Sequence, residues 1–369
     1  MTANPSPRYF IGLMTGTSLD GIDAVLVDFA TPTPELIATH SADMPDELRA
    51  DLMRLQSPSD NEIHLTHLAA NAHSRVCADV VAHLLQQANI TAAQIIAIGN
   101  HGQTIRHRPE LGYTIQIGNN AALAEYTGIT VVGDFRSRDI AAGGQGAPLV
   151  PAFHQAIFGT NHTNRVIVNI GGIANISWLG QDGYVSGFDS GPGNVLMDLW
   201  VQQHKGLHYD ANGEWAASGR PDEGLLTQML SDPYFSHPAP KSTGRDLFHR
   251  HWLESHLAQF NRAIKAEDVQ ATLAQLTAST IASAINSQGK VDEVFVCGGG
   301  AYNQYLMDCI AAQLACPVLS TANLGVDPSW VEAYAFAWLA MRCIDRQSGN
   351  LPAVTGAAGL RILGAIYPH

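Results

Sequence analysis

The sequence predicts an α/β protein made of two similar halves. Its 369 residues correspond to about two domains, because a domain usually has roughly 100–200 residues. Each half opens with an apolar strand, a glycine-rich turn and a second strand, and then alternates helices with strands. This repeated pattern, in a chain without a low-complexity linker, predicts two layered α/β domains that face each other across a cleft.

The first half contains several apolar runs of strand length and one long helical pattern. Residues 9–14 and 22–29 flank a turn rich in Gly, Thr and Ser, and they are expected to pair as a hairpin. From about residue 61 to 87, apolar residues recur every three or four positions, which indicates an amphipathic helix. Short buried strands are then expected at residues 95–98, 113–117 and 129–132.

The second half follows a glycine-rich turn at residues 142–148. It opens with strands expected at residues 165–172 and 173–178, joined at Gly171-Gly172. A long helix is expected at 268–286, followed by a strand at 291–297, the turn Gly298-Gly299-Gly300 and a helix from about residue 303. The last helix, at about 330–345, is rich in alanine and apolar throughout.

The composition argues against several classes of protein. A net charge of −13 without clusters of Lys or Arg disfavours nucleic acid or an anionic membrane as a partner, because attraction to phosphate dominates such binding. The five cysteines are scattered without a C-x-x-C pair, which disfavours a disulfide framework and a zinc knuckle and favours a reducing cytoplasm. No apolar run reaches the roughly 18–20 residues needed to span a bilayer. We therefore expect a soluble cytoplasmic protein.

Four glycine-rich turns are expected directly after strands, at residues 16–21, 171–172, 187–193 and 298–300. Glycine lets the backbone approach a ligand closely and point successive N–H groups at an anion. One such turn alone is more often an ordinary tight turn. Four of them across both halves favour a composite anion site.

Familiar catalytic motifs are missing from the chain. Neither the P-loop nor the Rossmann G-x-G-x-x-G occurs. The nucleophile-elbow pattern is approached at residues 16–20 but fails at Asp20, where the motif needs glycine. The sixteen histidines include no H-E-x-x-H, so most are interpreted as solvated or as satisfied in the core, His101 excepted.

Carboxylates accompany the glycine turns. Strand ends are where ligands bind in open α/β sheets, and phosphoryl transfer needs donors for the phosphates and a carboxylate that accepts a proton. Asp189 is expected just after a strand and before a helix, where the structural alternative is a helix N-cap. Six aspartates lie at or beside turns or strand ends: Asp20, Asp23, Asp134, Asp139, Asp189 and Asp198.

Several motifs resemble the anhydro-N-acetylmuramic acid kinase family, which belongs to the superfamily of sugar kinases, Hsp70 and actin. The resemblance extends from about Tyr9 to Pro368. Position 190, here Ser190, holds Thr or Cys in other family members, so a small side chain is enough. The matching segments are residues 10–23, 101–104, 116–119, 133–136 with Asp139, 143–151, 169–175, 188–194, 241–245 and 297–300.

The resemblance implies two actin-like, or ribonuclease H-like, domains with mixed sheets flanked by helices and an ATP cleft between them. Residues 1–135 with about 346–369 would form the N-terminal domain, and residues 136–345 the C-terminal one. It also implies ATP with Mg²⁺, a homodimer and a small anhydro-amino sugar as substrate. The metal ligands stay unassigned.

The implied reaction belongs to peptidoglycan recycling and amino-sugar catabolism. Water would open the 1,6-anhydro bridge of 1,6-anhydro-N-acetylmuramic acid while O6 takes the γ-phosphate, giving N-acetylmuramic acid 6-phosphate and ADP. By motif, Asp189 would be the base that deprotonates the water. The phosphates would be lined by Gly16, Thr17, Ser18, Leu19, Asp20, Gly21, Ile22 and Asp23, with Gly171 and Gly172 as a second loop and Gly298, Gly299 and Gly300 beside the adenosine. The sugar would be bound by His101, Gln103, Arg136, Gln145 and Asn194.

Two alternatives remain open at this point. A sugar kinase of the same superfamily could act on a free hydroxyl with Asp189 as its base. A non-catalytic ATP switch would instead show nucleotide turnover that no sugar affects, and it would need a client-binding domain for which this chain is too short.

Overall fold

The apolar runs on either side of the first glycine turn form an antiparallel hairpin, as predicted. These strands are β1 (Tyr9–Met14) and β2 (Gly21–Asp28), with Tyr9 opposite Asp28 and Met14 opposite Asp23.

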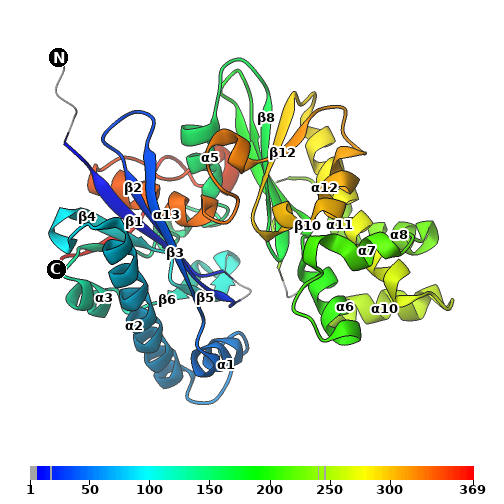
Figure 1. Cartoon of the computed structure of the whole chain (residues 1–369), viewed down its shortest axis with the longest axis horizontal. Coiled ribbons are helices and arrows are strands. Elements are labelled where there is room, and N and C mark those ends of the chain that lie inside the picture. Colours follow the sequence, from blue (N-terminus) through cyan, green and yellow to red (C-terminus); the bar gives the residue numbers. More distant parts are fainter. Residues whose placement is uncertain (1–5, 17–18, 240, 245–246) are drawn as a thin grey trace. The chain divides into compact units, whose positions relative to one another are not determined.

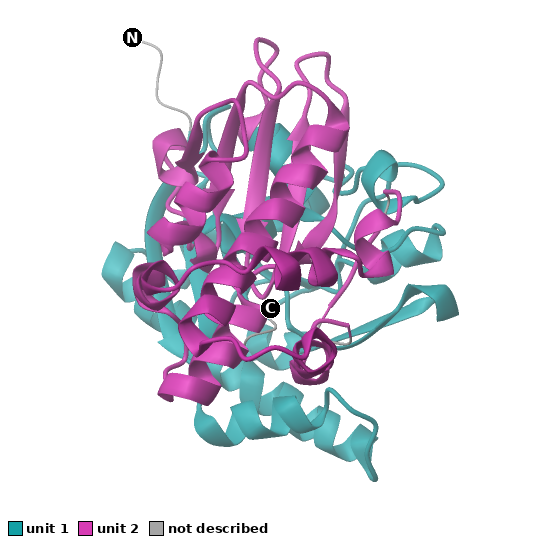
Figure 2. Cartoon of the chain, turned by 90° about the vertical axis from the view of Figure 1, so that its right-hand side faces the viewer, with its two compact units in different colours: residues 1–157, 330–369 teal, residues 158–329 magenta. Residues whose placement is uncertain are grey.

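The structure is a computed structural model that describes residues 6–16, 19–239, 241–244 and 247–369. Its contacts divide the chain into unit 1, residues 1–157 and 330–369, and unit 2, residues 158–329 (Figure 2).

Unit 1 is built on a six-stranded sheet in the order β13-β7-β4-β1-β2-β3 (Figure 1). Strands β1, β2 and β3 form an antiparallel meander, whereas β4 and β7 run parallel to β1. The other strands of this sheet are β3 (Glu35–Asp43), β4 (Ile95–Asn100), β7 (Val131–Gly133) and β13 (Ala365–Tyr367). A separate antiparallel pair is formed by β5 (Gln103–Arg108) and β6 (Tyr113–Ile117).

Helices cover both faces of this sheet. Side chains alternate between the two faces of a strand, so Ile11 and Leu13 pack in the core formed with α2 while Gly12 faces α13. A Cβ atom on Gly12 or Gly99 would overlap the backbone of α13, so this helix rests directly on the strands. The helices of unit 1 are α1 (Asp46–Arg54), α2 (Glu62–Ala88), η1 (Ala92–Gln94), η2 (Pro109–Leu111), α3 (Asn120–Thr127), α4 (Ser137–Ala141), α5 (Val150–Phe158, whose last residue falls in unit 2), α13 (Val331–Ile344) and α14 (Pro352–Thr355).

Unit 2 repeats the topology with a five-stranded sheet in the order β10-β9-β8-β11-β12. Strands β8, β9 and β10 form the antiparallel meander, and β11 and β12 extend the sheet in parallel with β8. Each unit thus places its first strand between the hairpin partner and a parallel neighbour. This shared topology confirms the predicted fold class of two mixed sheets flanked by helices. The strands are β8 (Arg165–Ile170), β9 (Ile173–Leu179), β10 (Val185–Pro192), β11 (Glu293–Cys297) and β12 (Val318–Ser320).

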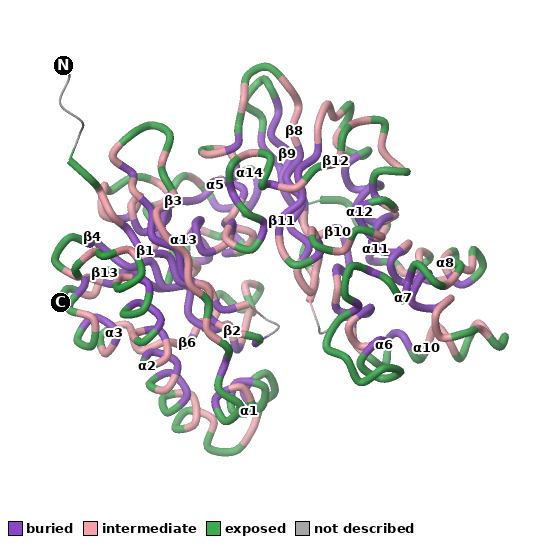
Figure 3. The backbone as a smooth tube through the Cα atoms, viewed as in Figure 1, coloured by how far each residue is buried: buried purple, intermediate pink, exposed green. Residues whose placement is uncertain are grey.

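The core of unit 2 surrounds helix α11, which is buried along most of its length (Figure 3). Ala, Leu, Ile and Thr on α11 pack against β9 and β10 and against helices α6, α7, α8 and α12. A helix enclosed in this way is apolar around most of its circumference. The helices of unit 2 are α6 (Val195–Lys205), η3 (Ala211–Gly213), α7 (Glu214–Ser218), α8 (Glu223–Leu230), α9 (Pro233–Ser236), α10 (Arg250–Phe260), α11 (Ala266–Gln288), η4 (Gly299–Tyr302), α12 (Gln304–Ala311) and η5 (Thr321–Leu324).

Two sequence expectations differ from the structure. The segment 187–193, expected as a turn, lies in β10 through Pro192, because it pairs with β9 across a bulge between Asp189 and Gly191. The contacts divide the chain at 157/158 and 329/330, whereas the expected boundaries were at about 135/136 and 345/346. The reason is that α13 lies against β1, β2 and β4, α5 packs on α13 through Phe153, and α4 contacts β6.

Three buried histidines make the stability of unit 1 depend on pH. Burial lowers the pKa of His73 to about 4 and that of His154 to about 3, and burial together with Arg136 lowers the pKa of His101 to about 3. Each native pKa lies below the ordinary value of about 6.5, so at intermediate pH the unfolded chain binds protons that the native state does not. This stability is complete above about pH 6.5 and is lost as the pH falls toward 3.

We expect the substitution His154→Gln to flatten this dependence. Between pH 6.5 and 5, the free energy of unfolding should fall less steeply in the variant than in the parent. Near pH 5 the two slopes should differ by about 1.4 kcal/mol per pH unit, the contribution of one proton. Urea denaturation at a series of pH values measures the slope. The exposed His64 on α2 provides the control, since His64→Gln makes the same change of residue type at a position that is not buried. Equal slopes for His154→Gln and the parent would contradict the assignment of a neutral buried imidazole.

Candidate active site

Three of the predicted glycine segments meet at one edge of the unit 2 sheet. Strands β8, β10 and β11 point in the same direction, so Gly171-Gly172, Gly193-Asn194 and Gly298–Gly300 follow strand ends at that edge. The amide of Gly193 donates to the Gly172 carbonyl at 2.9 Å, and the amide of Asn194 donates to Gly171 at 2.8 Å. The Asn194 side chain also donates to the Ile170 carbonyl at 3.2 Å. Asn194 is therefore part of this edge.

Gly298 occupies a position that only glycine fits. Its φ of +77° lies in the left-handed region, and a Cβ would overlap Asn169 Oδ1 and lie 2.8 Å from the Ile170 carbonyl oxygen. Asn169 is buried, and its Oδ1 has no hydrogen-bond partner among the described residues. The turn thus brings bare backbone and a buried acceptor to the same sheet edge. Bare backbone lets a ligand approach closely, and the acceptor suits a donor such as a hydroxyl or amino group of a nucleoside, so the residues present fit a nucleotide.

Asp189 lies in β10 at the bulge, half-buried, with its side chain held by a neighbouring loop. The amide of Thr243 donates to Asp189 Oδ2 at 2.9 Å, and the Asp189 amide donates to the Lys241 carbonyl at 3.2 Å. The hydroxyl of Tyr234 donates to the Asp189 carbonyl at 2.7 Å. Asp189 is thus fixed through both its backbone and its carboxylate.

The structural alternative for Asp189, a helix N-cap, is wrong. Helix α6 begins at Val195, and the residue at its cap position is Asn194. Since Asp189 is inside a strand and five residues before Asn194, its carboxylate does not cap the helix. Asp189 is instead a strand residue at the bulge in the β9–β10 pair.

The sequence assigns no role to the segment around Lys241, although residues 241–245 are among those that match the family. The Lys241 ammonium donates to the carbonyls of Tyr234 at 3.1 Å and Phe235 at 3.3 Å, and it lies 4.6 Å from the centre of the Tyr234 ring. Burial lowers the pKa of Lys241, and burial followed by the charge of Asp189 raises the pKa of Tyr234. Lys241, Tyr234 and Thr243 therefore form a support for Asp189. Arg245, in the same motif, lies outside the described residues.

In unit 1, the structure brings His101 and Arg136 into contact. Arg136 Nη2 donates to His101 Nε2 at 3.0 Å, and Arg136 Nη1 donates to the Gly146 carbonyl at 2.8 Å. Burial and the Arg136 charge lower the pKa of His101 to about 3, so the imidazole is neutral at physiological pH. Gln103 is fully buried, and its Oε1 has no hydrogen-bond partner among the described residues. Gln145 is exposed beside Gly146, and its amide donates to the Thr355 carbonyl at 2.7 Å.

Asp139 holds this part of unit 1 together. Its carboxylate is fully buried and accepts hydrogen bonds from the Gly146 amide, the Asn350 side chain and the Thr355 hydroxyl, each at 2.8 Å. The three donors come from the glycine-rich turn and from the C-terminal segment. Asp139 is therefore a positioning residue for α4 and for Arg136. Asn350 and Thr355 had no signal in the sequence that would pair them with Asp139.

The first glycine turn is described only in part, because Thr17 and Ser18 lie outside the described residues. Leu19 is buried with a φ of +60°, and Gly21, Ile22 and Asp23 already belong to β2. Asp20 forms an ion pair with Arg49 at 2.9 Å. Asp23 accepts a hydrogen bond from Ser41 at 2.8 Å, and burial raises its pKa. Gly16, which accepts a bond from the Leu19 amide, closes the turn.

The two remaining predicted aspartates lie in the described part of the chain. Asp134 is exposed after β7 with a φ of +54°, and Asp198 lies on α6. Within the described residues, no group of three or more His, Cys, Asp or Glu side chains could hold a metal ion. No helix in the described part of the chain is long and apolar enough to cross a membrane.

Comparison with known proteins finds similarity along nearly the whole chain. The family model described as anhydro-N-acetylmuramic acid kinase matches residues 8–369. The anhydro-N-acetylmuramic acid kinase of Cupriavidus pinatubonensis is 56% identical over 98% of this chain and 98% of its own length, and that of Cupriavidus metallidurans is 54% identical over 100% of both. Among solved structures, the activator of 2-hydroxyisocaproyl-CoA dehydratase from Clostridium difficile covers 92% of this chain and 96% of its own, with 13% identity and a TM-score of 0.49.

The family model and the two relatives confirm the predicted resemblance. They define this two-unit α/β protein, with its glycine turns at strand ends, as a kinase. The chain belongs to the anhydro-N-acetylmuramic acid kinase family.

The turn at Gly298 provides a test of nucleotide binding. We expect Gly298→Ala to weaken ATP binding at least about tenfold, because the new methyl group must displace Asn169 or the Ile170 carbonyl and so distort the turn. Isothermal titration calorimetry with ATP measures the loss. Gly206 is the matched control: its φ of +68° imposes the same backbone strain, yet a Cβ there meets nothing within 4 Å. ATP binding by Gly298→Ala equal to that of Gly206→Ala would remove this turn from the nucleotide site.

Proposed function

We propose that this chain is the kinase that converts 1,6-anhydro-N-acetylmuramic acid and water, with ATP, into N-acetylmuramic acid 6-phosphate and ADP. Family membership over residues 8–369 supports the substrate, and the observation that carries the mechanism is the position of Asp189. Its carboxylate is fixed by the Thr243 amide, beside the glycine segments that end β8 and β10. Such a reaction belongs to peptidoglycan recycling.

The chemistry of the anhydro bridge requires a base. O6 of the substrate is bonded to the anomeric carbon, so it gains a free electron pair only when that bond breaks. A water oxygen forms the new bond to the anomeric carbon, and the water proton passes to the Asp189 carboxylate. ATP, bound with Mg²⁺, supplies the phosphoryl group that O6 receives. The Thr243 amide keeps the carboxylate oriented toward the water throughout.

The glycine turns hold the nucleotide in this proposal. Gly171-Gly172 and the segment from Gly16 to Asp23 line the phosphates, and the turn from Gly298 to Gly300 lies beside the adenosine. Backbone N–H groups suit this role in a chain of net charge −13, because they attract phosphate locally without a surface of lysines. Mg²⁺ usually keeps several waters and is bound through substrate phosphates with one or two carboxylates, and its ligands in this chain stay unassigned.

The sugar is assigned to His101, Gln103, Arg136, Gln145 and Asn194. The guanidinium of Arg136 is anchored by Gly146 and by a neutral His101, which accepts its hydrogen bond but does not neutralise its charge. Arg136 is thus a fixed cation for the lactyl carboxylate of the sugar. The buried Oε1 of Gln103 is an acceptor for a sugar hydroxyl or the acetamido N–H.

The oligomeric state and the cellular location of the protein are part of the same proposal. We propose a homodimer that acts in the cytoplasm, where ATP is available and the five free thiols remain reduced. Neither nucleic acid nor a membrane is a partner in this proposal. The net charge of −13 supports that view.

The substitution Asp189→Asn tests the base. An amide keeps an oxygen that can accept the Thr243 bond but takes no proton from water, so kcat should fall about 10²–10⁴-fold. The melting temperature and ATP affinity should stay near those of the parent. Asp182 is a matched control, since its exposed carboxylate also accepts one backbone amide, that of Tyr184 at 3.0 Å, and Asp182→Asn should retain full activity. A purified Asp189→Asn enzyme with near-normal turnover would refute the assignment.

The choice of substrate separates this function from its alternatives. We expect ADP to form in a one-to-one ratio with 1,6-anhydro-N-acetylmuramic acid consumed, and free N-acetylmuramic acid to be phosphorylated poorly. The reason is that bond cleavage at the anomeric carbon is what activates O6. A coupled ADP assay with mass spectrometry of the product measures both. Rapid phosphorylation of the free sugar would instead indicate a kinase acting on an ordinary hydroxyl, and ADP release unaffected by either sugar would indicate an ATP switch.

A further inference from the structure

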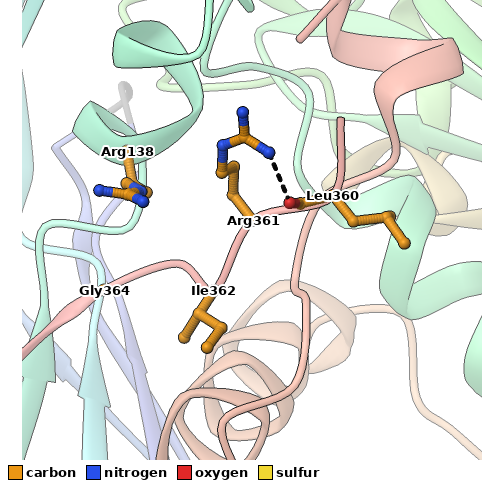
Figure 4. A pocket seen from close by; sticks show the side chains of 5 residues that line it. All are labelled: Arg138, Leu360, Arg361, Ile362 and Gly364. Carbon is orange, nitrogen blue, oxygen red and sulfur yellow. Dashed lines mark hydrogen bonds between the residues drawn. The ribbon is translucent and has the colours of Figure 1, made fainter. Parts of the chain in front are cut away.

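Unit 1 contains a hollow of about 500 Å³ that the proposed reaction does not use. It is lined by Arg138, Leu360, Arg361, Ile362 and Gly364. Figure 4 shows the guanidinium groups of Arg138 and Arg361 beside the same open space, with the Ile362 side chain next to it. Small-molecule sites are commonly about 300–1,000 Å³, so the hollow has the size of a site for a metabolite.

The two arginines lack a counter-charge within the described chain. Neither guanidinium forms an ion pair with a described carboxylate, and Arg361 Nη1 donates to the Leu360 carbonyl at 2.8 Å. The chain has 33 acidic residues against 20 Lys and Arg, so carboxylate partners are abundant in its composition. Two unpaired guanidinium groups at one hollow favour an anionic ligand, since their planar N–H groups match carboxylate and phosphate oxygens.

The rest of the lining favours an organic anion over a bare ion. Ile362 is 44% exposed, which leaves an apolar side chain beside the two charges. Gly364 adds no side chain to the wall, and its φ of +98° is one that other residues rarely adopt. A ligand with a phosphate or carboxylate group and a short hydrocarbon part would use both the guanidinium groups and the apolar wall.

The segments that bear the two arginines are connected by hydrogen bonds through the buried Asn350. Arg138 lies on α4 next to Asp139, whose carboxylate accepts a bond from Asn350 at 2.8 Å. Asn350 Oδ1 in turn accepts a bond from the Arg361 amide at 2.7 Å. Asn350 thus joins the backbone that bears Arg361 to the helix that bears Arg138, and Thr355, which also donates to Asp139, adds a second link from the C-terminal segment. The backbone positions of the two arginines are therefore fixed relative to each other before any ligand binds.

We propose that the hollow between Arg138 and Arg361 is a second ligand site, which binds a small organic anion bearing a phosphate or a carboxylate. The two guanidinium groups bind the anionic head, and Ile362 contacts the carbon chain. A bound anion links α4 to the C-terminal segment in addition to the Asp139–Asn350 bond, and it therefore stabilises this region of unit 1.

Calorimetric titration of the full chain with butyl phosphate, pentanoate and inorganic phosphate tests the site. Saturating Mg²⁺ and a non-hydrolysable ATP analogue keep the nucleotide phosphate site filled during each titration. We expect at least one of the two organic anions to bind with a Kd of about 1 mM or tighter, and more tightly than inorganic phosphate. The organic anion that binds more tightly shows whether the site prefers a phosphate or a carboxylate. Affinity should fall as salt is added, because the contacts are charged.

Two double variants complete the test. Arg138→Gln with Arg361→Gln should weaken binding at least about tenfold while leaving the melting temperature without ligand unchanged. Arg54→Gln with Arg220→Gln removes the same total charge from two exposed positions that do not line the hollow, and it should bind as the parent does. The proposal is overturned if neither organic anion binds the parent below about 10 mM, or if both double variants bind equally well.

Discussion

The buried carboxylate of Asp139 is the interaction on which the proposed sugar-binding side of unit 1 depends. A charge removed from water is tolerated only when hydrogen bonds replace its hydration. Here three donors do so, from the glycine-rich turn, from Asn350 and from Thr355. Because the donors lie in segments distant in sequence, the carboxylate fixes where the C-terminal segment meets α4. The position of Arg136, three residues earlier, follows from that junction.

A second constraint is that some positions of the fold have no room for a side chain and require glycine. Gly12 and Gly99 let α13 lie directly against β1 and β4, and Gly298 lets its turn lie against Asn169 and Ile170. In each place the distance between backbones is set by van der Waals contact, so a single methyl group is too large. The glycine content of this chain is thus used both for helix packing and for the proposed nucleotide turns.

Much of the fold could be predicted because apolar runs and glycine turns are local signals. The hairpins β1–β2 and β8–β9, the long helices and the strand β11, which pairs with β8 and β12, were all visible in the spacing of apolar residues. Strand β10 was missed because Gly187, Gly191 and Pro192 are residues that strands usually avoid. Its strand conformation comes from pairing with β9, a partner that lies earlier in the chain. Strand β3 was missed as well, since its residues are half-exposed and follow no clear alternation.

The positions of the candidate site's parts in the fold could be predicted to the same extent, whereas their roles stay predictions. Glycine turns after strands indicated where a phosphate could bind, and the resemblance singled out Asp189. The partners of these groups were not predictable, because Thr243 is 54 residues from Asp189 and Asn350 is 211 residues from Asp139. Such pairs are determined by tertiary packing, which leaves no periodic signal in either segment.

The path of the chain between the two units affects how the protein is synthesised. Residues 158–329 form unit 2, and only afterwards does the ribosome deliver α13 and β13 to the first sheet. Until then the strands that bear Gly12 and Gly99 lack the helix that covers one of their faces, and β7 lacks its neighbour at the sheet edge. Unit 2 is complete in sequence before unit 1 is, which reverses the usual order in which the N-terminal domain folds first. The nascent chain therefore exposes an apolar sheet face for the whole time that unit 2 is translated, and this is the period in which a chaperone would protect it from aggregation.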